Sequence, residues 1–179
     1  MSNTRGTALV VGAGVIGATS AFRLARDGWR VTMFDPAPGR GATWAAAGMI
    51  APQGEVAPGE IENYRRQRDA VASWRELAQE LFDVTNRHVS VIQTGTLFVG
   101  LDGGDRQLVD QVAHVADDFG VSAVRVSRDT HDSFFQDVTP RIGEGLYFEG
   151  DGWVNPDEAL SVISSANEKL GVTVVRETV

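Results

Sequence analysis

The sequence predicts an α/β protein built on a Rossmann-like, doubly wound parallel sheet, together with part of an α+β domain. Three observations predict it: residues 7–11 are a short apolar run, residues 15–27 show helical periodicity, and residues 30–34 are a second apolar run. A strand, a helix and a strand in this order form a βαβ unit, whose two strands are expected to be parallel.

The remaining elements follow from periodicity and from the residues that begin or end them. In the first helix, Ile16, Ala21 and Phe22 recur at helical spacing, and Gly28 ends the helix. The later pattern predicts helices at 43–49, 58–82 and 105–119, strands at 89–92, 96–101 and 121–126, a short helix at 127–135 capped by Ser127, and a strand at 145–149 closed by a turn at 151–152. Asn155 and Pro156 begin a last helix that stops before Gly171, and residues 172–176 form a last strand.

Composition excludes several classes of function. The 179 residues contain no Cys, which excludes disulfide scaffolds, zinc–thiolate sites, iron–sulfur clusters and thiol nucleophiles. The three His residues are widely spaced, so we predict no metal site, and Lys169 is the only Lys, which excludes a Walker-type phosphate loop. The net charge of −8 argues against binding to nucleic acid or to an anionic membrane. No stretch approaches the roughly 20 apolar residues of a membrane helix, and we expect a cytoplasmic protein.

The turn between the first strand and the first helix reads Gly-Ala-Gly-Val-Ile-Gly at residues 12–17, as in dinucleotide-binding turns. Gly12 permits the tight turn, Gly14 lets a pyrophosphate approach the backbone, and Gly17 lets helix and strand pack closely. The helix N-terminus offers unpaired N–H groups and the positive end of its dipole. Asp35 ends the second strand, where a carboxylate accepts hydrogen bonds from the adenosine ribose and disfavours a 2′-phosphate. The motif predicts an adenine dinucleotide but does not decide between NAD and FAD.

A second motif occupies residues 41–52, which read Gly-Ala-Thr-Trp-Ala-Ala-Ala-Gly-Met-Ile-Ala-Pro, with Glu55 shortly after. The run of small residues removes side-chain bulk from one stretch of backbone, as a large flat ring lying against the chain would need. On the residues alone, a small-residue helix packed against the sheet explains the run equally well.

With these motifs the chain resembles the D-amino-acid-oxidase superfamily of flavoenzymes, and within it the glycine oxidases of thiamine biosynthesis. That family carries the glycine turn, an acid after the second strand, and a segment Ala-Ala-Ala-Gly-Met-(Leu/Ile)-Ala-Pro followed by Glu, in this order and at similar spacing. Residues 151–156 and the strand after Gly171 also resemble it, so the resemblance covers essentially the whole chain. Trp44 departs from the small polar residue expected there, and Asp35 replaces the more usual Glu.

The resemblance implies FAD as the cofactor. It implies an FAD-binding part made of residues 1–85 and about 145–179, and a substrate domain that begins at about 86–144. The cofactor contacts carried over by position are Gly12, Gly14, Val15, Ile16, Gly17, Asp35, Ala42, Thr43, Ala46, Ala47, Gly48 and Met49. Of these, Ala47, Gly48 and Met49 are expected beside the isoalloxazine ring.

The resemblance also implies oxidative deamination of glycine or another small amino acid or amine. A hydride passes from Cα to flavin N5, and molecular oxygen reoxidises the flavin to give hydrogen peroxide. In this family no side chain is needed as a general base, so we assign no catalytic residue. An NAD-dependent dehydrogenase module and a non-catalytic protein that keeps the fold without flavin stay open as alternatives.

The family's C-terminal half has no counterpart in these 179 residues. In the family that half supplies the Arg that pairs with the substrate carboxylate, a Tyr of the substrate pocket, and further strands of the sheet. We therefore expect a fragment, or one chain of a larger assembly, completed by a C-terminal half or by a second copy of the chain. Such a chain is expected to expose sheet edges and apolar faces.

Overall fold

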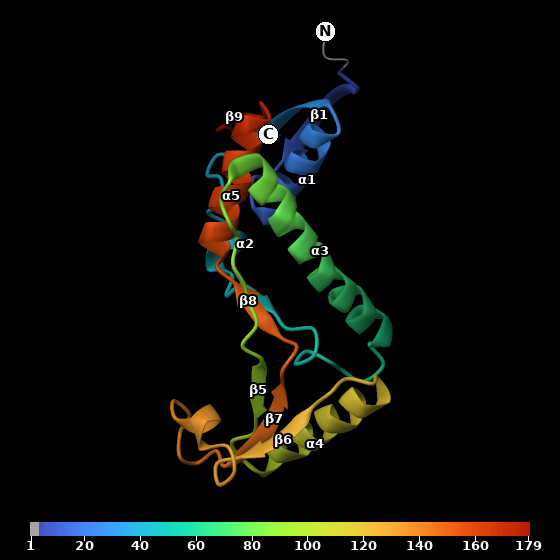
Figure 1. The fold of residues 1–179 in the computed structure, drawn as a ribbon, viewed down its shortest axis with the longest axis vertical. Coiled ribbons are helices and arrows are strands. Elements are labelled where there is room, and N and C mark those ends of the chain that lie inside the picture. The colour runs from blue at the N-terminus through green and yellow to red at the C-terminus, as the bar shows by residue number, and fades with distance from the viewer. Residues whose placement is uncertain (1–3) are drawn as a thin grey trace. The chain divides into compact units, whose positions relative to one another are not determined.

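The computed structural model describes residues 4–179, which divide into two compact units (Figure 1). The first consists of residues 4–49, 74–90 and 154–179, and the second of residues 50–73 and 91–153. The resemblance assigns residues 50–73 and 145–153 to the FAD-binding part, whereas they lie in the second unit; it assigns residues 86–90 to the substrate domain, whereas they lie in the first. The long helix explains part of this difference, because Tyr64 near its start packs into the core of the second unit, whereas Leu77 and Leu81 near its end pack into the core of the first.

The first unit contains a parallel sheet of order β1-β2-β9, made of β1 (Gly6–Val11), β2 (Trp29–Phe34) and β9 (Thr173–Val175). The predicted parallel βαβ start is confirmed, with Ala8 opposite Val31 and Val10 opposite Met33. These apolar side chains share one face of the sheet, because residues in register on neighbouring strands point to the same side. That face is where the helices pack.

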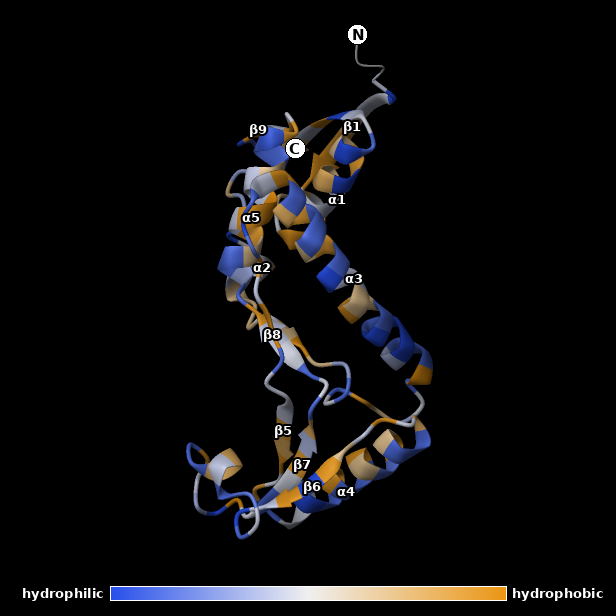
Figure 2. Cartoon of the chain, in the orientation of Figure 1, coloured by the Kyte–Doolittle hydropathy of each residue, from blue (hydrophilic) through white to orange (hydrophobic). Residues whose placement is uncertain are grey.

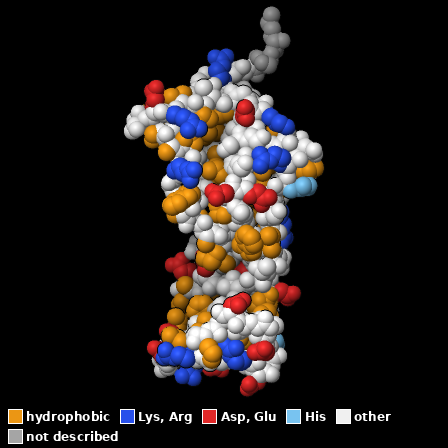
Figure 3. All heavy atoms as spheres, turned by 90° about the vertical axis from the view of Figure 1, so that its left-hand side faces the viewer, with side chains coloured by type: hydrophobic (Ala, Val, Ile, Leu, Met, Phe, Trp, Pro, Cys, Tyr) orange, Lys and Arg blue, Asp and Glu red, His pale blue; other side chains and the backbone are white. Residues whose placement is uncertain are grey.

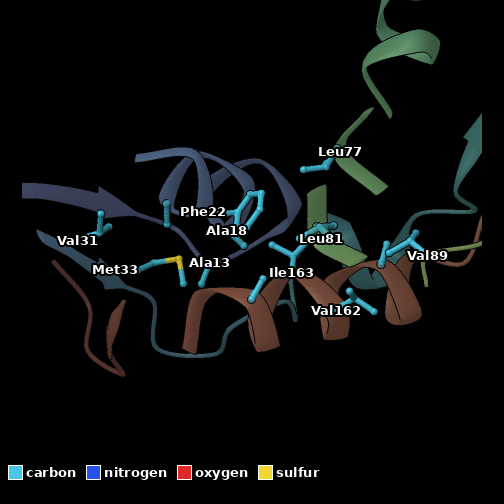
Figure 4. Close-up of a cluster of buried hydrophobic side chains, with 13 residues drawn as sticks. Ala13, Ala18, Phe22, Val31, Met33, Leu77, Leu81, Val89, Val162 and Ile163 are labelled. Atoms are coloured by element: carbon cyan, nitrogen blue, oxygen red, sulfur yellow. The ribbon is translucent and has the colours of Figure 1, made fainter. Parts of the chain in front are cut away.

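The core of the first unit lies between this face and helices α1 (Val15–Arg26), α5 (Pro156–Lys169) and the end of α3 (Ile61–Thr85) (Figure 4). Its buried side chains are Ala13, Ala18, Ala21, Phe22, Val31, Met33, Leu77, Leu81, Val89, Ala159, Val162, Ile163 and Ala166. The side-chain amide of Asn167, itself buried, donates a 2.9 Å hydrogen bond to the Ala18 carbonyl and so fixes α5 against α1. The first turn of α1 is therefore packed against the core of this unit.

Local chemistry explains where α1 and α5 end and begin. Gly28 follows α1 with φ of +86°, the left-handed conformation that favours glycine after a helix. The Asn155 side chain accepts hydrogen bonds from the N–H groups of Asp157 and Glu158, and Pro156 occupies the first helical position. Both predicted helix signals are confirmed.

The opposite face of β1 is exposed. Leu9 is 68% and Val11 is 71% exposed, whereas the intervening Ala8 and Val10 are partly buried. In doubly wound sheets both faces are covered by helices. Residues 4–179 leave this side of β1 open.

The second unit contains an antiparallel sheet of order β5-β7-β6, made of β5 (Thr96–Val99), β7 (Glu144–Phe148) and β6 (Val124–Ser127). Helix α4 (Gly103–Asp118) contributes Val109, Val112 and Val115 to a core that includes Leu146 and Phe148 of β7. Val126, Phe135 and Ile142 form a separate cluster. A helix packed on an antiparallel sheet is the expected α+β arrangement.

Short elements make up the rest. Strands β3 (Met49–Ile50), β8 (Gly152–Val154) and β4 (Val91–Ile92) form a sheet of order β3-β8-β4, and α2 spans Ala42–Ala45. The helix predicted for 43–49 is thus shorter, and strand β8 follows Asp151 where the sequence predicts only a turn. Within residues 46–60, which connect α2 to α3, the two-residue strand β3 is the one regular element.

The helix predicted for 127–135 with Ser127 as its cap is wrong. Ser127 is the last residue of β6, and only η1 (Asp132–Phe135) forms a 3₁₀ turn. The Arg128 guanidinium donates to the carbonyls of Phe135, Val138, Thr139 and Ile142. Ser127 pairs with Glu144 of β7 and the Arg128 N–H donates to the Gly143 carbonyl, so the start of the predicted helix continues the strand pairing instead. The Arg128 side chain then holds the loop that follows.

The surface is mixed in character. Figure 2 shows that the middle of α3 is largely hydrophilic, whereas the strands carry many hydrophobic residues. On the face drawn in Figure 3, basic side chains alternate with acidic ones and do not gather in one basic patch. Among residues 4–179, no helix has the length and apolar character needed to cross a membrane.

Candidate cofactor-binding site

A pocket of about 660 Å³ lies in the first unit, where β1 passes into α1. The pocket is within the size range of small-molecule and cofactor sites. Its lining residues are Val10, Val11, Gly12, Gly14, Val15, Ile16, Gly17, Ser20, Asp35, Gly39, Gly41, Ala42, Thr43 and Ala46. The fold thus brings together every predicted cofactor residue except Ala47, Gly48 and Met49.

The glycine turn is shaped by two different constraints. Gly12 has φ of +95°, which L side chains rarely adopt. A Cβ on Gly17 would lie 1.9 Å from the Gly12 carbonyl oxygen and 3.4 Å from Cγ1 of Val10. Gly12 is therefore required by backbone conformation, and Gly17 by the close approach of α1 to the turn and to β1.

Thr43 reaches the start of α1 from the second motif. Its hydroxyl oxygen accepts the Val15 N–H at 2.9 Å, and a Cβ on Gly14 would lie 3.0 Å from that oxygen. The absent side chain of Gly14 thus leaves room for Thr43 beside the helix N-terminus. The hydroxyl keeps its own proton available for donation into the pocket.

The first turn of α1 keeps two further donors. Within residues 4–179, the N–H groups of Ile16 and Gly17 have no hydrogen-bond acceptor, as expected for the first positions of a helix. They stand at the positive end of the helix dipole, which favours an anion. The donor set suits a phosphate oxygen.

Asp35 connects three segments of the site. Its Oδ2 accepts the Ala13 N–H at 2.7 Å, and its Oδ1 accepts the Ala37 N–H at 2.8 Å. A carboxylate has about four lone-pair positions, so capacity remains for ribose hydroxyls. The sequence signal that identified Asp35, an acid at the end of β2, carried no information about its bond to Ala13.

Ala47, Gly48 and Met49 do not line this pocket, and Met49 is the first residue of β3. The Gly48 carbonyl accepts the Val154 N–H at 2.9 Å, and Gly48 has φ of +76°. A Cβ there would lie 2.0 Å from the Val154 carbonyl oxygen. Met49 is 65% exposed, so a large apolar side chain stands open to solvent next to this fixed backbone.

The sequence patterns did not single out Ser20, Gly39 or Gly41 as site residues, although all three line the pocket. Ser20 lies one turn beyond Ile16, whose carbonyl accepts its hydroxyl at 2.9 Å. Helical spacing from the glycine turn is the signal that identifies it, because residues three or four apart share a helix face. Gly39 and Gly41 follow Asp35 in a loop with no regular pattern.

Two negative results concern other site types. Among residues 4–179 no group of three His, Cys, Asp or Glu side chains is placed to hold a metal ion. Arg128, a partly buried arginine, is committed to backbone carbonyls and to the face of the Phe135 ring. Arg128 is therefore a structural residue of the second unit.

The chain matches a known family along nearly its whole length. A family model described as "DAO: FAD dependent oxidoreductase" matches residues 7–179. Glycine oxidase of Bacillus licheniformis is 24% identical over 176 residues, covering 95% of this chain and 45% of that protein. The tRNA 5-methylaminomethyl-2-thiouridine biosynthesis bifunctional protein MnmC of a Polaromonas species is 41% identical over 80 residues, covering 44% of this chain and 12% of that protein.

Solved structures show the same fold. The crystal structure of glycine oxidase from Geobacillus kaustophilus has a TM-score of 0.81 and 23% identity, covering 94% of this chain and 45% of that chain. The chain spans less than half the length of these relatives.

Proposed function

Because the chain belongs to the family of FAD-dependent oxidoreductases, we propose that it forms the cofactor-binding part of an enzyme that oxidises glycine or another small amino acid or amine. Relatives named glycine oxidase that match along nearly the whole chain support this substrate class. We extend the proposal to a role in thiamine biosynthesis, on the resemblance of the Ala-Ala-Ala-Gly-Met segment to that group of glycine oxidases. The coarser assignment, an FAD-dependent oxidoreductase, does not depend on it.

The residues of the pocket fit FAD in their chemistry. In the proposed binding mode the N–H groups of Ile16 and Gly17 donate to the pyrophosphate, and the Thr43 hydroxyl adds a donor beside the same helix N-terminus. Asp35 accepts hydrogen bonds from the ribose hydroxyls. Bound FAD would supply the two-electron acceptor for amine oxidation. The convergence of these groups in one pocket is the observation that carries the proposal.

The small residues of the second motif have a separate role in the proposed mode. In this mode the backbone and apolar side chains of Ala47, Gly48 and Met49 would lie against the flat ring of the flavin. Gly48 keeps that backbone close to Val154, since no side chain fits between them. These residues would orient the ring and exclude water from one side of it.

The exposed side of β1 supports a further part of the proposal. Leu9 and Val11 lie on a face that doubly wound sheets normally bury. We propose that additional polypeptide covers this face in the active enzyme, either a C-terminal half or a second copy of the chain. The substrate-binding groups would then come from that polypeptide, with molecular oxygen as the second substrate.

A reconstitution experiment tests the proposal. The chain is titrated with FAD, and then mixed with a C-terminal half matched in length to that of the glycine oxidases; glycine, sarcosine and D-alanine are supplied and hydrogen peroxide is measured. We expect the chain to bind FAD and the Asp35→Ala variant to bind it more weakly. We expect hydrogen peroxide to form in the presence of an amine only when the chain and the C-terminal half are mixed. FAD binding with no oxidation of any amine would retain the cofactor role but reject the amine oxidase. Binding of NAD instead of FAD would favour a dehydrogenase module.

A further inference from the structure

Asp151 is a charged side chain with no exposed surface. No salt bridge within residues 4–179 reaches it. Burial of a carboxylate costs free energy unless hydrogen bonds compensate for the lost water. Desolvation accordingly raises the pKa of Asp151, while hydrogen bonds from Gln53, Gly54 and Thr96 oppose that rise.

The carboxylate holds the loop that follows the second motif. Oδ1 accepts the Gln53 N–H at 2.9 Å, and Oδ2 accepts the Gly54 N–H at 2.7 Å. The Asp151 carbonyl accepts the Gly95 N–H at 2.9 Å, and the Gln53 side chain accepts the Gly150 N–H at 3.0 Å. The loop is thus bonded to Asp151 and to its neighbour Gly150, and Asp151 is also bonded to Gly95.

The contact is also tight. A Cβ on Gly54 would lie 3.0 Å from Oδ2 of Asp151 and 2.8 Å from Cγ2 of Thr96. A Cβ on Gly152 would lie 2.2 Å from the Ile92 carbonyl oxygen. Glycine at both positions lets the backbone close around the carboxylate, so the arrangement has little room to shift.

The other end of the same segment is held by Val154. Val154 lies three residues after Asp151, and its N–H donates a hydrogen bond to the Gly48 carbonyl. Residues 48–54 are therefore fixed at both ends to residues 151–154: at Gly48 through Val154, and at Gln53 and Gly54 through Asp151. A segment fixed at both ends samples fewer conformations than one fixed at a single end.

We propose that Asp151 is a positioning residue, which holds residues 48–54 in the conformation that presents Ala47, Gly48 and Met49 to the flavin ring. The inference rests on the proposed function for its flavin part. A carboxylate suits the task because its two oxygens accept two neighbouring N–H groups at once. An amide offers one oxygen and turns an NH₂ donor toward the other N–H.

Hydrogen–deuterium exchange of the full chain without added FAD tests the positioning. We expect Asp151→Asn to raise exchange about tenfold at Gln53 and Gly54, the change that corresponds to losing one such hydrogen bond, and to raise it also at residues 47–49. Thr96→Val removes only one hydrogen bond to the carboxylate and is expected to give the same pattern at smaller amplitude, which covers the case in which Asp151→Asn does not fold. Arg128→Lys is the matched control, since it weakens backbone contacts of the same unit without touching residues 48–54 or Asp151. The proposal would be overturned if exchange at residues 53–54 became faster while exchange at residues 47–49 stayed the same, or if exchange at residues 53–54 did not change.

Flavin binding supplies the second readout. We expect Asp151→Asn and Thr96→Val to weaken FAD binding and to shift the visible spectrum of the bound flavin, whereas Arg128→Lys leaves both unchanged. If the wild-type chain binds FAD and both Asp151→Asn and Thr96→Val match it in affinity and in the spectrum of the bound flavin, the flavin part of the proposal is overturned. If the wild-type chain binds no FAD, the proposed function fails, and the exchange result alone decides whether Asp151 positions residues 47–49.

Discussion

Asp35 and Ala13 are joined by a 2.7 Å hydrogen bond from the Ala13 N–H to Oδ2 of the carboxylate, 22 residues apart in sequence. The bond fixes the glycine turn to the end of β2 before any cofactor is present. Asp35 thus has a structural role in the pocket in addition to the proposed ribose contact. The two roles are separable by experiment.

Asp35→Ala is expected to lower the free energy of unfolding of the FAD-free chain by about 2 kcal/mol, because hydrogen bonds to a charged group contribute roughly 1.5–3 kcal/mol each and Asp35 is partly exposed. Urea unfolding measures the change. Asp27→Ala is the control: this exposed residue caps α1 through its backbone only, and its replacement is expected to change stability by about 0.5 kcal/mol or less. Equal stability of Asp35→Ala and wild type would show that the bond to Ala13 contributes nothing.

Gly17→Ala is expected to destabilise the chain by about 3 kcal/mol, since its Cβ would stand 1.9 Å from a backbone carbonyl oxygen that belongs to the turn. Gly41→Ala is the matched variant, because Gly41 lines the same pocket, has φ of −92° and has no atom within 4 Å of the added Cβ. Thermal unfolding of the two variants should therefore differ clearly. Similar stability would mean that the approach of α1 to the turn is not the constraint on Gly17.

Thr43→Val removes the acceptor of the Val15 N–H and the one hydroxyl that the second motif contributes to the pocket. We expect FAD affinity to fall about tenfold, as for the loss of one hydrogen bond. Thr43→Ser keeps the hydroxyl and is expected to bind FAD almost as the wild type does. A Thr43→Ser variant that binds FAD as weakly as Thr43→Val would contradict this, because Ser keeps the hydroxyl.

The sequence predicted the parallel βαβ start, the caps of α1 and α5, and most of the residues that line the pocket, because each leaves a local signal. Gly28, Asn155 and Pro156 act within a few residues of their own positions. Glycine spacing and the acid after β2 likewise report a local backbone requirement.

Long-range contacts explain what the sequence did not predict. Ser127 pairs with Glu144 where a helix is predicted to begin, and Arg128 gathers carbonyls from residues 135–142 in the loop that follows. Asp151 accepts N–H groups from residues nearly one hundred positions earlier, and nothing in the local pattern marks it as buried. Such contacts depend on tertiary packing, which propensity and periodicity do not encode.

The pH dependence of stability should carry a contribution from Asp151. Burial raises the pKa of this carboxyl above its ordinary value of 3.8, so the folded chain holds the proton to higher pH than the unfolded chain. From pH 3.8 up to the raised pKa, the folded state binds more protons, and the free energy of unfolding falls as pH rises. This stabilising contribution is complete below that window and lost above it.

Urea unfolding of the wild type and Asp151→Asn from about pH 3 to pH 7 isolates the contribution. Asn does not titrate, so the wild type is expected to lose stability relative to the variant as pH rises through the window. If the free energies of unfolding of the wild type and Asp151→Asn differ by the same amount at every pH, that result would contradict a raised pKa at Asp151.

The flavin content of the purified chain tests the central claim most directly. The chain is isolated, its visible spectrum is recorded, flavin released by heat is identified, and any flavin-free fraction is titrated with FAD. We expect FAD bound at one molecule per chain, with weaker binding in Thr43→Val and Asp35→Ala. A folded chain that neither retains flavin nor binds added FAD, alone or with the C-terminal half supplied, would contradict it.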